Sequence, residues 1–143
     1  MKNANQFYKD IIIRISEQSE CLSRKVGAIA VIDGRIIGEG WNSPPPKCHV
    51  LECIRCNSKE KIESGTQVEL SLCGHGESNL TSNCAYLGIS LKNAIIYCTT
   101  KPCSSCATLL VQSGVSKIYY IHDYNSLYTD LILDRGKVKH SVF

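Results

Sequence analysis

Long hydrophobic runs and a strong charge of one sign are both missing from this 143-residue chain. The amino-terminal stretch MKNANQFYKDIII holds an apolar run of only three residues, too short for a signal peptide or a membrane span. The formal net charge is only +3 and no basic run occurs, so a nucleic-acid partner is not indicated. We therefore expect a protein that binds neither membranes nor nucleic acid and stays in a reducing cytoplasm.

Internal repeats and domain boundaries are also lacking. Hydrophobic residues make up 43% of the chain and charged residues 20%, which are ordinary values for a globular protein. A chain of this length can bury a core without disulfide staples. The sequence therefore predicts one domain over residues 1–143.

Helical and strand patterns alternate along the chain. Apolar spacing predicts an amphipathic helix over residues 4–18, and two β-branched runs around Asp33-Gly34 predict a hairpin with a type I′ turn. The later patterns predict, in order, a helix over 77–87, a strand at AIIYCTT, a helix between Pro102 and Gly114, a strand at KIYYI, a weaker helix or turn over 127–133 and a last strand over 137–142. This order predicts an α/β protein with a mixed sheet of about five strands flanked by helices.

Cysteine, by contrast, is abundant, with nine residues in the chain. The stretch TTKPCSSCATLL could hold a disulfide, a redox couple or two metal ligands. His75 and Glu77 begin one predicted helix and Cys103 and Cys106 begin the next, so the four side chains are expected to converge at one edge of the sheet. One imidazole and two thiolates with a vacant fourth position are typical of a catalytic zinc site, and both helix dipoles favour thiolate there. A redox pair would need neither His75 nor Glu77.

The pattern H-x-E…P-C-x-x-C is the signature of zinc-dependent nucleobase deaminases. More widely, the chain resembles the deoxycytidylate (dCMP) deaminases of the cytidine deaminase superfamily, including viral and eukaryotic members. The matching blocks span residues 21–125 and are CLSRKVGAIAV, DGRIIGEGWNSPP, CIRCNS, LCGHGESN, TTKPCSSCATLLVQSGVSKIYY and the tyrosine of HDYN. The resemblance implies the three-layer cytidine deaminase-like fold.

The resemblance also implies roles for individual residues. His75, Cys103 and Cys106 would hold zinc, and Glu77 would carry protons. Further residues are implied on the substrate side: Asn42 at the deoxyribose, Arg24, Tyr120 and Tyr124 toward the phosphate and base, and Gly76, which stands where the family has alanine. Other interpretations stay open for three of them, because Asn42 could be a turn residue, Arg24 a solvated charge and Tyr120 part of the core.

The implied reaction converts dCMP to dUMP and ammonia, which would supply dUMP for thymidylate synthesis. Alternatives are deamination of dCTP, of free cytidine, of a tRNA base or of a pterin-like ring, or a zinc-binding nucleotide sensor without activity. Family members are commonly hexamers regulated by dCTP and dTTP, so a homo-hexamer, both effectors and Mg²⁺ with a triphosphate are expected. The cytoplasm would be that of a host if the protein is viral.

The segment from Asn42 to Gly74 predicts a long loop, which is unusual in a compact domain unless something ties it down. A second, structural zinc would do so. Its candidate ligands are Cys53, Cys56 and Cys73, with Cys48 or Cys21 as the fourth; His49 could replace one of them. The alternative is that several of these cysteines are buried apolar side chains, as we expect for Cys84 and Cys98.

Overall fold

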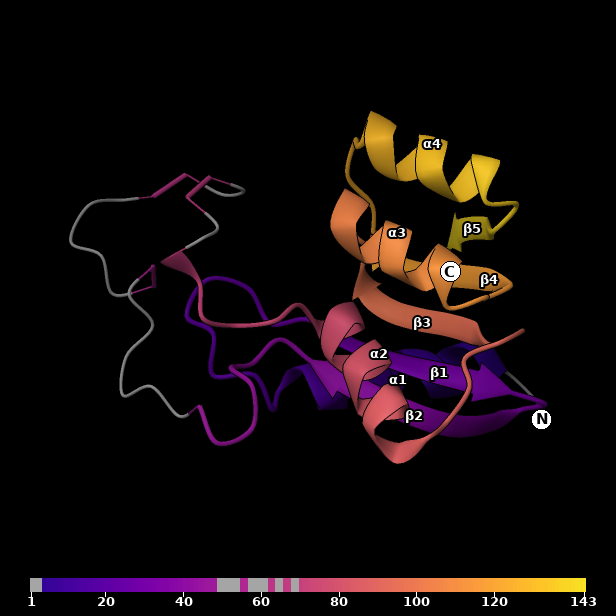
Figure 1. Cartoon of the computed structure of the whole chain (residues 1–143), viewed down its shortest axis with the longest axis horizontal. Helices are drawn as coiled ribbons and strands as arrows, with labels where there is room; N and C mark the ends of the chain where they lie inside the picture. Colours follow the sequence, from indigo (N-terminus) through magenta and orange to yellow (C-terminus); the bar gives the residue numbers. More distant parts are fainter. Residues whose placement is uncertain (1–3, 49–54, 57–61, 64–65, 68–69) are drawn as a thin grey trace.

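The computed structural model describes residues 4–48, 55–56, 62–63, 66–67 and 70–143. Within these residues, one mixed sheet has the strand order β2-β1-β3-β4-β5. The strands are β1 (Gly27–Ile32), β2 (Arg35–Trp41), β3 (Ile95–Thr100), β4 (Lys117–His122) and β5 (Lys139–Val142). The helices are α1 (Ala4–Ser16), α2 (Gly76–Leu87), α3 (Ser104–Gln112) and α4 (Leu127–Arg135), arranged as Figure 1 shows.

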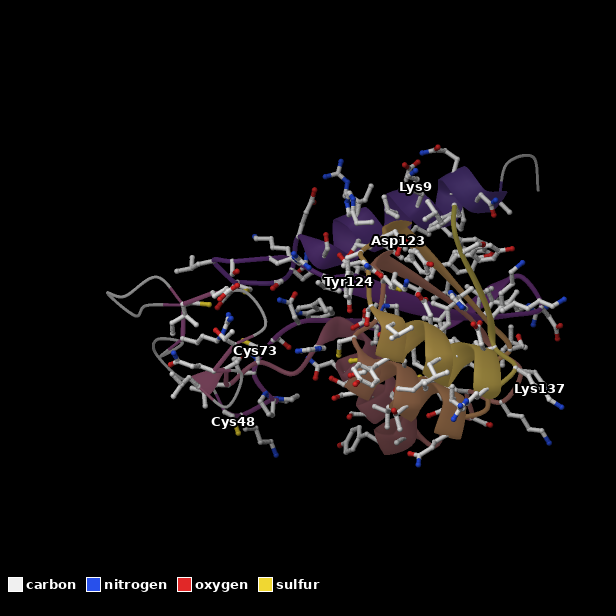
Figure 2. All side chains as sticks on the ribbon, turned by 90° about the horizontal axis from the view of Figure 1, so that it is seen from above. Lys9, Cys48, Cys73, Asp123, Tyr124 and Lys137 are labelled. Carbon is white, nitrogen blue, oxygen red and sulfur yellow. The ribbon has the colours of Figure 1, made fainter. Side chains whose placement is uncertain are left out.

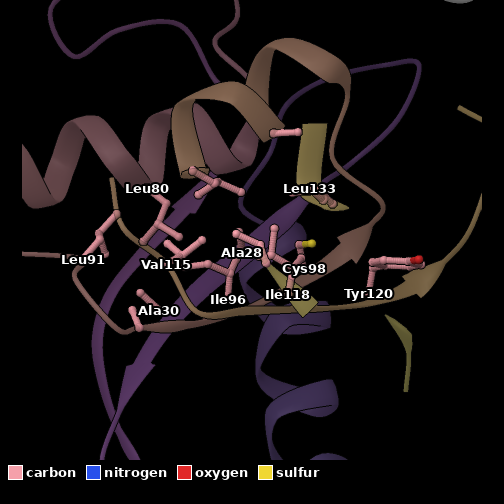
Figure 3. Close-up of a cluster of buried hydrophobic side chains, with 14 of the residues drawn as sticks. Ala28, Ala30, Leu80, Leu91, Ile96, Cys98, Val115, Ile118, Tyr120 and Leu133 are labelled. Carbon is pink, nitrogen blue, oxygen red and sulfur yellow. The ribbon is translucent and has the colours of Figure 1, made fainter. Parts of the chain in front are cut away.

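The helices cover both faces of the sheet because its inner strands are apolar on both sides. In β1, Ala28 and Ala30 belong to the larger buried cluster, which includes residues of α2 and α3 (Figure 3). Ile29 and Val31 alternate with them and pack with Ile12 of α1 on the opposite face. The predicted three-layer α/β fold is confirmed.

The hairpin between β1 and β2 has the predicted turn. Ile32 pairs with Arg35, which leaves a two-residue loop. Asp33 has φ 50° and Gly34 has φ 74°, and positive φ at both positions defines a type I′ turn.

One edge of the sheet collects the segments that carry the candidate site. β1 runs antiparallel to both β2 and β3, so the start of β1 lies beside the ends of β2 and β3. β4 runs parallel to β3 and ends at the same edge, where Thr100 pairs with His122. Chain segments that leave β2, β3 and β4 therefore emerge side by side.

The outer elements differ little from the sequence prediction. α1 ends at Ser16 rather than Gln18, where the Ser16 hydroxyl donates to the Ile13 carbonyl at 2.7 Å. The weaker helix and the last strand are both present, as α4 and β5. The long loop is closed at its base, where Ser43 and Gly74 exchange backbone hydrogen bonds of 3.2 and 2.9 Å. Over the described residues, no helix has the length and apolar character needed to cross a membrane.

Candidate metal centre

The amino-terminal end of α2 positions His75 and Glu77. His75 is the N-cap residue, and Glu77 lies in the first turn with only 4% of its surface exposed. This end is pressed against β2: a Cβ at Gly40 would lie 2.5 Å from the Gly76 carbonyl oxygen and 2.8 Å from the Leu80 Cα. Because glycine has no Cβ, its presence at position 40 lets the backbone of α2 pack directly against β2.

Asn79 ties the same end of α2 to the chain that leaves β2. Its side-chain amide donates to the Trp41 carbonyl at 2.8 Å and to the Ser43 carbonyl at 3.2 Å. Asn79 is not among the residues predicted above, although it is the last residue of the HGESN stretch. The spacing of that motif was the signal that could have found it.

The amino-terminal end of α3 positions the two cysteines. Cys103 is the N-cap residue, and its Sγ accepts a hydrogen bond from the Cys106 backbone N–H at 3.5 Å. Pro102 precedes the cap, and Gly114 follows the helix with φ 79°, as predicted. Cys106 is 3% exposed and faces inward.

The structure brings the three predicted ligands together. The Nδ1 atom of His75 lies 3.3 Å from the Cys103 Sγ and 3.5 Å from the Cys106 Sγ. All three ligand atoms lie within 4.8 Å of one another. In a tetrahedral zinc site, nitrogen and sulfur ligands are separated by about 3.5 Å. The donor set and its spacing fit zinc with one coordination position left for a non-protein ligand.

The pKa values in this cluster are shifted in different directions, and only the shift of Cys103 favours the form that binds a metal ion. The pKa of Cys103 is lowered to about 4, chiefly because the Cys106 thiol hydrogen-bonds to it and His75 adds a second hydrogen bond. The pKa of His75 is raised by its hydrogen bond to Cys103. Burial raises the pKa of Glu77 to about 7. A thiolate at Cys103 is the form that a metal ion binds.

A cavity of about 580 Å³ lies at the carboxyl ends of β3 and β4. Thr99 and Thr100, just before the cysteine-bearing turn, form part of its wall, as do Arg24 and Tyr124. The Tyr124 hydroxyl donates to the Pro102 carbonyl at 3.1 Å, so the wall is bonded to the residue that precedes Cys103. The cavity therefore borders the turn that leads into Cys103, although neither the triad residues nor Glu77 are among those that line it.

The remaining substrate candidates lie in different settings. Tyr120 is 3% exposed within the larger core cluster, in agreement with its alternative interpretation as a core residue. The Asn42 side chain bonds to backbone, accepting from the Val26 N–H at 2.8 Å and donating to the Arg24 carbonyl at 2.7 Å. A Cβ at Gly76 would lie 3.1 Å from the Val26 Cγ1. The Asn42 side chain thus holds the segment that carries Arg24, and Gly76 lies close to the same segment.

The candidate ligands of a second zinc are only partly described. The Cys21 and Cys56 Sγ atoms lie 3.9 Å apart, which brings together two cysteines 35 residues apart in sequence. Cys48 is exposed, Cys73 is partly buried, and both lie on the chain extension away from the sheet (Figure 2). Cys53 and His49 lie outside the described residues. Cys84 and Cys98 are 1% and 0% exposed, as expected for apolar core residues.

Comparison with known families decides the relationship. A family model described as the cytidine and deoxycytidylate deaminase zinc-binding region matches residues 1–122. The chain belongs to this family. The match includes His75, Glu77, Cys103 and Cys106, and therefore the whole cluster described above.

Individual members of the family resemble the chain to different extents. The deoxycytidylate deaminase of Schizosaccharomyces pombe is 30% identical over 85% of this chain, but the chain spans only 38% of that protein's length. The enzyme of phage T4 is 28% identical over 78% of this chain, which covers 74% of the phage protein. The crystal structure of a dCMP deaminase from cyanophage S-TIM5 with dCMP and dUMP gives a TM-score of 0.82 at 27% identity, covering 100% of this chain and 98% of that one.

A further solved structure is similar to the chain in fold. The diaminohydroxyphosphoribosylaminopyrimidine deaminase/reductase of Thermotoga maritima gives a TM-score of 0.68 at 17% identity. The match covers 98% of this chain and 36% of that protein.

Proposed function

We propose that this chain is a zinc-dependent deaminase that converts dCMP to dUMP and ammonia, with residues 1–143 acting as one deaminase domain. The observation that carries the proposal is the His75–Cys103–Cys106 triad with the buried carboxyl of Glu77 beside it. The likeness to a cyanophage dCMP deaminase over nearly the full length of both chains supports dCMP as the substrate. The dUMP formed would feed thymidylate synthesis.

The proposed mechanism divides the work between the metal ligands and Glu77. His75, Cys103 and Cys106 would hold zinc, which supplies a Lewis acid and lowers the pKa of a bound water. Glu77 takes the proton from the water that adds to C4 of cytosine and delivers it to N3. The same carboxyl then takes the remaining proton from the hydroxyl that has been added to C4 and passes it to the exocyclic nitrogen. The C4–N bond breaks as the C4 carbonyl forms, and the nitrogen leaves as ammonia. This is general acid–base catalysis by a single buried carboxyl.

The substrate would extend from the metal centre into the adjoining cavity. Arg24 and Lys25 both line that cavity and supply positive charge for the phosphate. Tyr124 lines the same cavity and would contact the nucleotide from the β4 side. Asn42 and Gly76 would shape the wall near the deoxyribose through their contacts with the 24–26 backbone.

Ammonia release from dCMP, deoxycytidine, cytidine and dCTP tests this function directly. A charged hydrogen bond to phosphate stabilises by about 1.5–3 kcal/mol, so kcat/KM for dCMP should exceed that for deoxycytidine by about tenfold or more. Comparable values for the two would contradict a nucleotide substrate. A preference for dCTP would identify the triphosphate alternative, and no release by zinc-loaded protein from any of the four would favour the sensor.

The regulation and the oligomeric state that we propose are supported by the resemblance to the family alone. We include dCTP as an activator, dTTP as an inhibitor, Mg²⁺ with a bound triphosphate and a homo-hexamer as the assembly.

The proposal also includes a second, structural zinc. Two thiolates on one tetrahedral zinc lie about 3.8 Å apart. The Cys21–Cys56 separation of 3.9 Å is close to that value and far longer than a disulfide bond. Cys73, Cys53 and Cys48 are the candidates for the remaining ligands. An ion there would join the segment before β1 to the long loop.

A further inference from the structure

Lys101 is a buried lysine immediately after β3. Its side chain is only 4% exposed. The Nζ atom lies 2.7 Å from the Asp130 Oδ1 and 3.1 Å from the Asp123 Oδ1, and it donates to the Tyr124 carbonyl at 3.3 Å. A lysine is retained inside a protein when its charge is paired in this way.

The partners of Lys101 come from two neighbouring segments. Asp123 and Tyr124 belong to the loop between β4 and α4, and Asp130 belongs to α4 itself. The Lys101 backbone N–H also donates to the His122 carbonyl at 2.9 Å. Lys101 therefore fastens the loop after β4 to the turn that leads into Cys103.

The loop held by Lys101 forms part of the cavity wall. Asp123 and Tyr124 line the cavity together with Arg24 and Lys25, and Figure 2 shows Asp123 and Tyr124 next to each other. Among the described residues, Arg24 and Lys25 form no ion pair, whereas the Asp123 carboxylate is paired with Lys101. The cavity lining thus contains two cations that form no ion pair among the described residues and one carboxylate that is paired with a buried lysine.

We propose that Lys101 is a positioning residue for recognition of the substrate's anionic group. By holding the Asp123 carboxylate, it prevents that group from pairing with Arg24 or Lys25 and from repelling an incoming phosphate. The inference rests on the proposed function, because it assigns the cavity to the phosphate of the nucleotide. It adds a residue that contacts neither the substrate nor the metal ligands.

The test is the isosteric, uncharged variant Lys101→Met. The freed Asp123 carboxylate should raise KM for dCMP by about tenfold, since like charges across a binding surface are strongly unfavourable. The kcat and the zinc content should stay within about twofold of wild type, and KM for deoxycytidine, which has no phosphate, should not change. Lys92→Met, at an exposed lysine outside the cavity, is the matched control and should leave every value unchanged.

Lys101→Met frees the carboxylates of both Asp123 and Asp130, but only Asp123 lines the cavity, so removal of the Asp123 charge should reverse the effect on KM. Adding Asp123→Asn to Lys101→Met is expected to restore most of the affinity for dCMP, whereas a purely structural role of Lys101 would give no rescue. A wild-type KM for dCMP in Lys101→Met, an equal rise for dCMP and deoxycytidine, or a failed rescue would each overturn the inference. If Lys101→Met does not fold, Lys101→Arg should keep a near-normal KM and Asp123→Asn alone should not raise it; a rise in either would overturn the inference.

Calorimetric binding of dUMP separates this inference from the proposed function. Wild-type protein that releases no ammonia from dCMP contradicts the proposed function. The Lys101 inference is then still tested, because dUMP affinity should fall in Lys101→Met and recover in the double variant. Unchanged dUMP affinity in Lys101→Met would overturn it.

Discussion

Glu77 is the residue on which the proposed chemistry depends most directly. It lies two positions from His75 at the start of α2, and its carboxyl is almost fully buried beside the triad. Among the described residues, the side chains placed to hold a metal ion are those of His75, Cys103 and Cys106. Glu77 is not part of that group. In the proposed mechanism, proton transfer and metal binding are therefore assigned to different side chains.

Glu77→Gln should remove deamination while zinc remains bound. An amide of the same shape cannot carry the proton, and loss of a general acid–base group costs about 10²–10⁴-fold in rate. The measurement is kcat for dCMP together with zinc per chain by elemental analysis. Cys106→Ala is the comparison and should lower both, because it deletes a ligand. Loss of zinc in Glu77→Gln would show that its role has been assigned wrongly.

At the scale of elements, the seating of α2 on the sheet sets the position of half the site. Gly40 allows the helix backbone to approach β2, and Asn79 bonds the first turn to the Trp41–Ser43 segment. On the other side, α3 begins directly after the turn that follows β3. The triad forms because both helices begin at the edge where β2 and β3 end.

Gly40→Ala should displace α2 and weaken the metal centre. The added methyl would meet the Gly76 carbonyl and the Leu80 backbone, which cannot move aside as a flexible side chain would. Overpacking of this kind costs about 1–3 kcal/mol, so a lower melting temperature and weaker zinc retention under a chelator are expected.

The matched control is Gly34→Asn in the hairpin turn. No atom lies within 4 Å of a Cβ at that position, and asparagine tolerates its positive φ. This variant should melt close to wild type. An unchanged melting temperature in Gly40→Ala would contradict the account of α2 seating.

For the whole molecule, the long loop is the segment whose stability needs explaining. Its base is closed by the Ser43–Gly74 backbone pair. The pairing of Cys21 with Cys56 is a contact between the segment before β1 and the loop. A closed zinc site there would supply folding free energy to the loop.

Protein purified without a chelator is accordingly expected to contain about two zinc ions per chain. Cys56→Ser should remove one of them and lower the melting temperature, with the catalytic zinc retained. Cys84→Ala, which deletes a buried core thiol, should keep both ions. A single zinc ion per wild-type chain would contradict the second site.

Several features follow from the sequence alone because a turn dipeptide, a helix start or the order of the elements predicts them. The Asp33-Gly34 pair predicts the type I′ turn. Pro102 and the apolar periodicity predict where the helices begin. The spacing of the motifs on alternating helices and strands predicts that His75 converges with Cys103 and Cys106. Tertiary structure alone decided the hydrogen-bond partners of Asn79, Asn42 and Lys101. Asn79 bonds to a residue 38 positions away, and the Lys101 Nζ donates to a carbonyl 23 positions away. Such partners are set by how the strands pair and the helices pack, so a motif such as HGESN can mark Asn79 as a candidate but cannot identify the residues to which it bonds.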